Sequence, residues 1–266
     1  MEQAGRTYSV AAVEKALRVL EVFGAAPHRF NLTEVAARTA LSTNQVFRLL
    51  QTLVGTGFVR QEPETKVYSL GPRLFGLVGA LFHGDALLVA AGDILTWAHE
   101  RTGETVALIV PNGDETICVD VRESPHPLLV AATVGSRSDH LHAGAVGKLL
   151  LAARDDAAID RYLVEQAPLR GFTARTPATP DAVWAEVRCT RAQGYALSDE
   201  EVAEGMYGIA APVRDRRGTV AAAITLSAPL TRAGESERTL HRQVVIEAGR
   251  RISESLGYRD RAPINS

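Results

Sequence analysis

Three histidines are the side chains of this 266-residue chain that most invite a catalytic or metal-binding interpretation. His140 and His142 stand two residues apart, which on a strand would place both imidazoles on one face, and His126 precedes them. Asp139 is the one carboxylate close to that pair in the sequence. The chain has no HExxH motif, nucleophile elbow, P-loop or GxGxxG fingerprint. We therefore expect no catalytic residue, no cofactor and no metal ligand, and interpret His142 as a partly buried, hydrogen-bonded residue.

A second group of polar side chains could read DNA bases. They lie on a predicted helix in which Val46, Leu49, Leu50 and Leu53 form one apolar stripe, so the polar and aromatic residues off this stripe face outward. A helix fits the major groove of B-DNA, where each base pair presents a distinct pattern of donors and acceptors. Arg48 suits guanine or a phosphate, and Asn44 suits adenine. The predicted DNA-contacting residues are Thr43, Asn44, Gln45, Phe47, Arg48, Gln51, Arg60 and Lys66.

The elements around this helix predict a helix-turn-helix. Apolar residues recur at helical spacing after Ser9, the expected N-cap of a first helix. Asn31 and Glu34 have the spacing of a capping box, which predicts the start of a second helix. Ser42 and Gln45 repeat that spacing at the start of a third. Only a short turn separates the last two helices, so they must cross steeply. A protein-binding winged helix with merely solvated polar residues is the alternative.

A β-hairpin, or wing, is predicted after the third helix. Residues 58–60 and 66–70 alternate apolar with polar side chains and are joined through a tip that contains proline. Arg60 and Lys66 in this wing suit contacts with the DNA backbone, which position a domain without reading sequence. Pro72 can then begin a linker helix that runs to about residue 82.

The remainder of the chain alternates helices with strands. Neighbouring strands joined by hairpin turns, such as the one at Asn112-Gly113-Asp114, predict a largely antiparallel sheet with helices packed on it. The pattern therefore predicts an α+β fold. The predicted strands span 105–111, 116–123, 128–134, 195–198, 209–214 and 220–228, and the predicted helices span 85–102, 143–153, 156–165, 181–193 and 237–256.

Composition points to an ordinary globular protein of the cytoplasm. Hydrophobic residues make up 46% and charged residues 23% of the chain, and no apolar run is long enough to span a membrane. Cys118 and Cys189 are too few for a disulfide framework and form no CxxC pair. The net charge of −2 does not favour DNA binding, although residues 1–80 carry three more basic than acidic residues.

Blocks of sequence in both halves follow the order of a known family. The blocks are Val13–Leu20, Leu32–Ala36, Arg48–Leu50, Gly57–Val59, His142–Lys148, Gly194–Glu201, Gly205-Met206, Ile209–Val213 and Ile224–Ser227. On these blocks the chain, from about Ser9 to Tyr258, resembles the IclR family of bacterial regulators.

The resemblance implies a winged helix-turn-helix DNA-binding domain over residues 1–71, a linker helix over 72–84 and a GAF-like effector-binding domain over 85–266. It implies a ligand-responsive transcriptional regulator, a repressor rather than an activator, of a catabolic or metabolic operon. The expected partners are a palindromic operator in double-stranded DNA, a small organic or aromatic acid, and further copies of the chain in a homodimer or a dimer of dimers.

The resemblance also implies which residues line the effector pocket. Thr225 and Ser227 would present hydroxyls on one strand face, since alternate residues of a strand share a face. A helix beginning near Gly144 would offer free amide groups to a carboxylate. Carried over by position, the effector-binding residues are Ala145, Val146, Ser198, Met206, Gly208, Thr225 and Ser227.

Two of these positions depart from the family's usual residues. Ser198 stands where an acidic residue is common, and Gly208 stands where Cys, Ser or Ala is common. Both changes enlarge the pocket and the first removes a charge, so we expect an effector larger than a two-carbon acid. The acidic run at residues 199–201 is interpreted as a solvated loop, with a functional role beside the pocket as the alternative. The alternatives are an interaction module whose cavity is filled by side chains, and a structural metal near His140 and His142.

Overall fold

The computed structural model describes residues 9–259 and divides into two compact units, Met1–Gly84 and Asp85–Ser266. The expected domains also include residues 1–8 and 260–266, which lie outside the described residues. Among the described helices, none combines the length and the apolar character needed to cross a bilayer.

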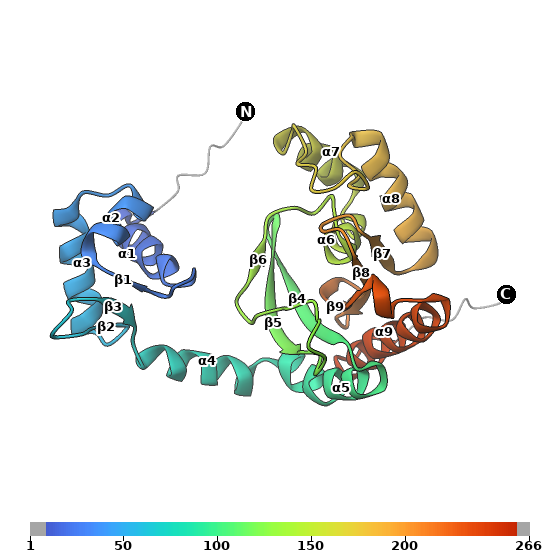
Figure 1. The fold of residues 1–266 in the computed structure, drawn as a ribbon, viewed down its shortest axis with the longest axis horizontal. Coiled ribbons are helices and arrows are strands. Elements are labelled where there is room, and N and C mark those ends of the chain that lie inside the picture. Colours follow the sequence, from blue (N-terminus) through green and yellow to red (C-terminus); the bar gives the residue numbers. More distant parts are fainter. Residues whose placement is uncertain (1–8, 260–266) are drawn as a thin grey trace. The chain divides into compact units, whose positions relative to one another are not determined.

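The first unit is a bundle of helices beside a three-stranded sheet (Figure 1). Its core is formed by buried side chains of all three bundle helices and of the sheet, among them Val19, Phe23, Val46, Leu50 and Tyr68. The sheet is antiparallel with strand order β1-β3-β2. The elements are α1 (Ala11–Val22), β1 (Arg29–Phe30), α2 (Leu32–Thr39), α3 (Thr43–Gly55), β2 (Val59–Gln61), β3 (Tyr68–Leu70) and α4 (Arg73–Gly84).

Both predicted capping boxes are present. The Asn31 side chain accepts a hydrogen bond from the Glu34 amide at 3.0 Å, and Glu34 accepts one from the Asn31 amide at 2.7 Å. Ser42 and Gln45 exchange the equivalent bonds at the start of α3. The prediction for Ser9 is wrong: α1 is capped by Val10 without a side-chain bond, and the Ser9 hydroxyl reaches forward to Glu14 instead.

Replacing Ser42 with alanine is expected to destabilise the first unit by about 1 kcal/mol, because the amide of residue 45 loses its acceptor. Urea unfolding of the full chain, followed by helical circular dichroism, measures this loss. Ser42→Thr keeps the acceptor oxygen and should retain most of the stability. Equal losses in the two variants would contradict the capping role.

The second unit is built on a six-stranded antiparallel sheet of order β6-β5-β4-β9-β8-β7. Helices α5 and α9 pack on one face, against side chains such as Leu108, Ile209 and Ile224. Helix α6 packs on the other face against small residues such as Ala210 and Ala223, and contacts α8 (Figure 1). The elements are α5 (Ala86–Thr102), β4 (Thr105–Asn112), β5 (Glu115–Arg122), β6 (Arg137–Ser138), α6 (Ala145–Ala152), α7 (Asp156–Glu165), α8 (Pro180–Gln193), β7 (Ala196–Asp199), β8 (Met206–Arg214), β9 (Val220–Pro229) and α9 (Glu235–Ser255).

The strand predicted over residues 128–134 is wrong. This segment is irregular, and Leu128 and Val134 are 59% and 51% exposed. The chain returns to β5 later, where residues 137–138 form β6 opposite residues 116–117. An apolar run becomes a strand only where a neighbouring strand can pair with it, and here the pairing falls on polar residues further along.

Candidate functional sites

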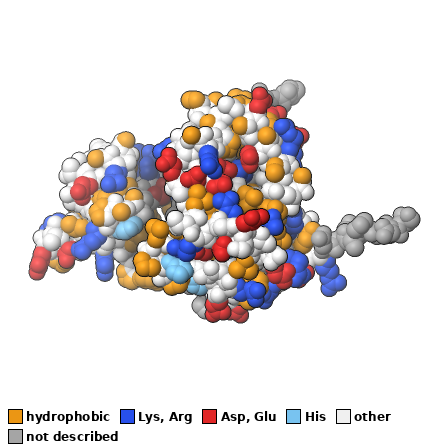
Figure 2. Space-filling model, turned by 45° about the vertical axis from the view of Figure 1, so that its right-hand side comes forward, with side chains coloured by type: hydrophobic (Ala, Val, Ile, Leu, Met, Phe, Trp, Pro, Cys, Tyr) orange, Lys and Arg blue, Asp and Glu red, His pale blue; other side chains and the backbone are white. Residues whose placement is uncertain are grey.

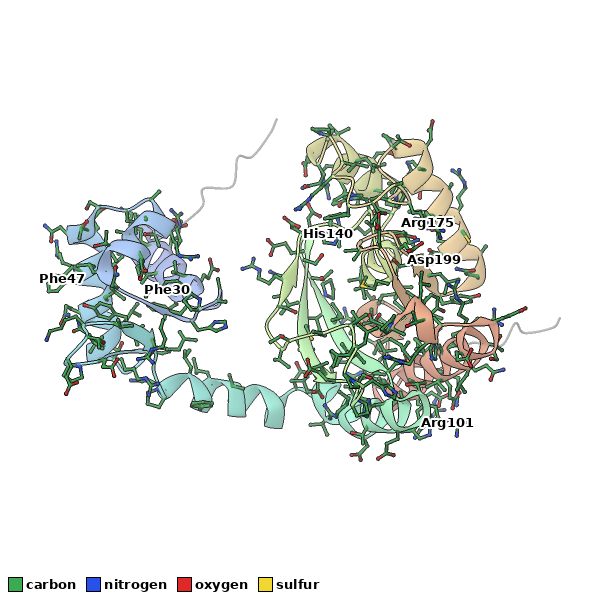
Figure 3. The ribbon with its side chains drawn as sticks, viewed as in Figure 1. Phe30, Phe47, Arg101, His140, Arg175 and Asp199 are labelled. Carbon is green, nitrogen blue, oxygen red and sulfur yellow. The ribbon has the colours of Figure 1, made fainter. Side chains whose placement is uncertain are left out.

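The outward face of α3 carries the six polar and aromatic residues predicted to contact DNA. All six are exposed, whereas Val46, Leu50 and Leu53 are buried. Phe47 is 45% exposed and lies on the outer side of α3 (Figure 3). All six residues except Thr43 line an open groove of about 590 Å³ that sequence reasoning did not foresee. Lys15 of α1 also lines this groove and adds a cation to it. The residues are Thr43, Asn44, Gln45, Phe47, Arg48 and Gln51.

The wing carries acidic side chains beside its two predicted DNA contacts. Arg60 and Lys66 are both exposed, and the Arg60 side chain donates to the Ser69 hydroxyl at 2.9 Å. Glu62 and Glu64 occupy the tip between them, and Glu62 pairs with a neighbouring arginine at 2.7 Å. The two basic residues of the wing are therefore balanced by two acidic ones, and the wing has no excess positive charge.

All seven residues predicted to line a pocket meet at one cavity of the second unit. The cavity has a volume of about 200 Å³ and lies between the start of α6 and the sheet. It is open between Val146, Met206 and Ser227, so the alternative of a cavity filled by side chains is wrong. The seven residues are Ala145, Val146, Ser198, Met206, Gly208, Thr225 and Ser227.

Three adjacent strands bring one row of these residues together. Ser198 on β7 lies opposite Gly208 on β8, which in turn lies opposite Ser227 on β9. A Cβ atom at position 208 would lie 3.7 to 3.8 Å from its neighbours, so glycine leaves space that alanine could occupy without strain. Ser198 is 1% exposed, and its hydroxyl has no hydrogen-bond partner in the described part of the chain.

The start of α6 lies unusually close to the segment before it. A Cβ atom at Gly147 would lie 2.7 Å from the carbonyl oxygen of His140, so glycine is required for this approach. The first amides of a helix have no partner within it, and Ala145 and Val146 line the cavity at this end. The amide of Gly144 is already bound, because it donates to a carboxylate oxygen of Glu201 at 3.0 Å.

A buried ion network holds that carboxylate in place. Lys148 is 2% exposed, and its Nζ contacts both Glu201 and Glu186, the latter at 2.5 Å. Burial raises the pKa of the Glu201 carboxyl, and the charge of Lys148 opposes that rise. The interpretation of residues 199–201 as a solvated loop is therefore wrong for Glu201. The local sequence gave no signal, since Lys148 lies more than fifty positions away.

The other two acidic side chains of that run are half-buried and pair with arginines. Asp199 lies 3.1 Å from Arg238 and 3.6 Å from Arg175, and Glu200 lies 3.3 Å from Arg175. Figure 3 shows Asp199 and Arg175 near each other. Figure 2 shows acidic and basic side chains intermixed on the face that it presents, so this face carries no large patch of one sign.

Part of the cavity wall was missed by sequence reasoning. The imidazole of His140 contributes to it, 4.5 Å from the Phe172 ring and 3.2 Å from the Ser138 hydroxyl, and burial lowers the pKa of this histidine. Burial raises the pKa of the Cys118 thiol to about 11, so the thiol stays protonated. The missed lining residues are Ile109, Thr116, Cys118, Ser136, Arg137, Ser138, His140, Ala143, Gly144, Gly147 and Val202.

His142 is fully hydrogen-bonded, as predicted, and is more deeply buried than expected. It is 3% exposed, with Nε2 2.9 Å from the Arg170 carbonyl and Nδ1 3.2 Å from the Tyr162 hydroxyl. The carbonyl requires a proton on Nε2, which leaves Nδ1 to accept from the tyrosine. Among the side chains that the structure describes, no three of His, Cys, Asp or Glu are grouped so that they could hold a metal ion.

Two family models match the chain. The model described as "Bacterial transcriptional regulator IclR C-terminal" matches residues 79–254. The model described as "IclR helix-turn-helix domain" matches residues 12–63.

Similar proteins match over nearly the whole length. BhcR of Paracoccus denitrificans, a transcriptional regulator, is 33% identical over 94% of this chain and 88% of its own. KdgR of Escherichia coli, also a transcriptional regulator, is 33% identical over 95% of each chain. A crystal structure of an IclR regulator from Alicyclobacillus acidocaldarius has a TM-score of 0.86 at 25% identity, over 94% of this chain and all of that one. The crystal structure of an IclR homologue from Microbacterium hydrocarbonoxydans, complexed with 4-hydroxybenzoate, has a TM-score of 0.80 at 24% identity. The match covers 93% of this chain and 99% of that one.

Proposed function

This chain belongs to the IclR family of bacterial transcriptional regulators, which are not enzymes, and from that premise we propose that it represses a catabolic or metabolic operon until a small organic or aromatic acid binds. The observation that carries the proposal is the single cavity lined by all seven residues expected to bind an effector. In this proposal the protein acts in the cytoplasm.

The proposed DNA interface is the outward face of α3 together with the wing. Arg48, Asn44 and Gln51 are exposed and unobstructed there, as base-reading side chains must be. A palindromic operator requires two such units, and apolar side chains that remain exposed on α1 and α4 favour a homodimer, or a dimer of dimers. These side chains include Val13 at 55%, Leu17 at 54% and Phe75 at 79% exposed.

The proposed effector is larger than a two-carbon acid. The cavity of about 200 Å³ and the missing side chain at Gly208 both favour a ligand of several carbon atoms. The Microbacterium homologue was crystallised with 4-hydroxybenzoate, so this acid is a rational first probe.

A thermal-shift screen of the full chain with small carboxylates, beginning with 4-hydroxybenzoate, tests effector binding. A ligand at a hundred times its dissociation constant should stabilise the protein by about 2.7 kcal/mol. Ser227→Ala should weaken a hit, because it removes a hydroxyl from the cavity wall, whereas Ser236→Ala on the exposed start of α9 should not. A hit that depends on neither serine would place the site elsewhere, and a fully bound two-carbon acid would contradict the expected size.

A further inference from the structure

We propose that the cavity, when it holds the carboxylate of an effector at the start of α6, rejects a second carboxylate, because the rest of the ligand is held by neutral hydrogen-bonding groups. This inference rests on the proposed function, since it specifies the chemical class of the acid that the cavity senses. Three features of the cavity carry it: the charge balance at the start of α6, the neutrality of the lining, and an unpartnered hydroxyl.

The start of α6 has a limited capacity for negative charge. The helix N-terminus attracts anions, but Glu201 already occupies the amide of Gly144 at 3.0 Å. Lys148 does not offset this carboxylate fully, because Glu186 shares the same ammonium group. One cation and two anions leave this network with a net charge of −1. The amides of Ala145 and Val146 therefore serve one ligand carboxylate, and any further anion would meet the field of Glu201.

Apart from one paired arginine, the polar groups elsewhere in the lining are uncharged. Burial keeps the Cys118 thiol protonated and disfavours the protonated form of His140. Arg137 is the single Lys or Arg among the described lining residues, and its guanidinium is paired with Glu115, with Nε 2.9 Å from the carboxylate. The remaining donors and acceptors are the hydroxyls of Thr116, Ser136, Ser138, Ser198, Thr225 and Ser227.

The hydroxyl of Ser198 marks where a neutral group of the ligand is expected. Its side chain is buried and lines the cavity, yet its Oγ has no partner in the described protein. Buried hydroxyls normally have a hydrogen-bond partner. If the Ser198 side chain rotates about χ1, its hydroxyl can form a hydrogen bond with a hydroxyl, carbonyl or amide group of the ligand. Gly208, directly across the strand pair, leaves the space for that group. A second carboxylate placed here would be buried without a counterion, which is costly.

The experiment is isothermal titration calorimetry of the full chain with matched pairs of acids. In each pair an acetyl group is exchanged for a carboxylate with the same number of heavy atoms: 4-acetylbenzoate against terephthalate, and levulinate against succinate. The monocarboxylate of a pair should bind at least about tenfold more tightly than its dicarboxylate partner.

Charge variants test the cause of the discrimination. Glu201→Gln should narrow the ratio of affinities within a pair, because the network then becomes neutral. Glu186→Gln produces the same change of charge while leaving the bond from Glu201 to Gly144 intact, so it serves if the first variant does not fold. Glu200→Gln is the matched control, because Glu200 precedes Glu201 in the sequence but does not line the cavity. The ratio of affinities in this variant should equal that of the wild type.

The outcomes separate this inference from the function on which it rests. A dicarboxylate that binds as tightly as its monocarboxylate partner overturns the inference, but it still supports the proposal that the cavity binds a small acid. The inference is also overturned if neither Glu201→Gln nor Glu186→Gln changes the ratio of the two affinities within a pair. If no acid of either class binds the wild type, acid sensing itself is overturned, and the inference falls with it.

Discussion

Replacing Lys148 with methionine is expected to destabilise the second unit by about 3 to 5 kcal/mol, because it leaves a buried carboxylate without its counterion. Lys148 is 2% exposed and the side chain of its partner Glu201 is 10% exposed, so water cannot replace the lost charge. Chemical unfolding of the full chain measures the loss. Arg188→Met removes an exposed cation from α8 and should change the stability by less than about 0.5 kcal/mol.

The same variant should show a distinctive pH dependence. Burial already raises the pKa of Glu201, and loss of Lys148 removes the largest opposing effect, so the pKa rises further. A carboxyl whose pKa is higher in the folded than in the unfolded chain costs stability as the pH rises above the unfolded value. The deficit of Lys148→Met relative to wild type should therefore grow from about pH 5 to about pH 8. If the loss of stability does not change with pH, Lys148 acts through packing alone. The same conclusion holds if the double variant Lys148→Met, Glu201→Gln is no more stable than Lys148→Met.

Replacing Arg48 with alanine is expected to weaken binding to the specific operator by about 10- to 100-fold, the value of one good base contact. Arg48 is exposed on the outward face of α3 and contributes to the groove there. The operator can be recovered by selection from random DNA, and binding is then measured by fluorescence anisotropy. Non-specific DNA should be affected much less, so the ratio of specific to non-specific affinity falls.

Lys66→Asn provides the comparison for a backbone contact. Lys66 has a φ of 58°, a left-handed conformation that asparagine tolerates, so the wing should keep its shape. Its loss should weaken specific and non-specific binding alike and reduce the salt dependence by about one ion. If Arg48→Ala also weakens both kinds of DNA equally, Arg48 contacts phosphate rather than a base.

Local features of the first unit were predictable because their causes lie within a few residues. The capping boxes at Asn31 and Ser42 and the apolar stripe of α3 need only short-range spacing, and all three are present. The two-residue strand β1 was missed because it exists only through its pairing with β3. The false strand at 128–134 had the right composition but no neighbouring strand to pair with.

The cavity was also only partly predictable from the sequence, because its walls come from segments that lie far apart in the chain. The row of Ser198, Gly208 and Ser227 followed from family resemblance, since nothing in their spacing announces that three strands place them side by side. The wall around His140 was missed because it depends on where β6 ends, two residues before it. The burial of Glu201 depends on a lysine far away in the sequence, and local composition suggested the opposite.

The sheet of the second unit has a consequence for how the protein is made. Its central pair joins β4, which begins at Thr105, to β9, which ends at Pro229. A ribosome delivers the chain from its N-terminus, so the cavity floor cannot assemble until almost all of the protein has emerged. The core of the first unit needs nothing beyond the strand that ends at Leu70. A message cut short between these points would therefore yield a complete helix-turn-helix unit without the cavity of the second unit.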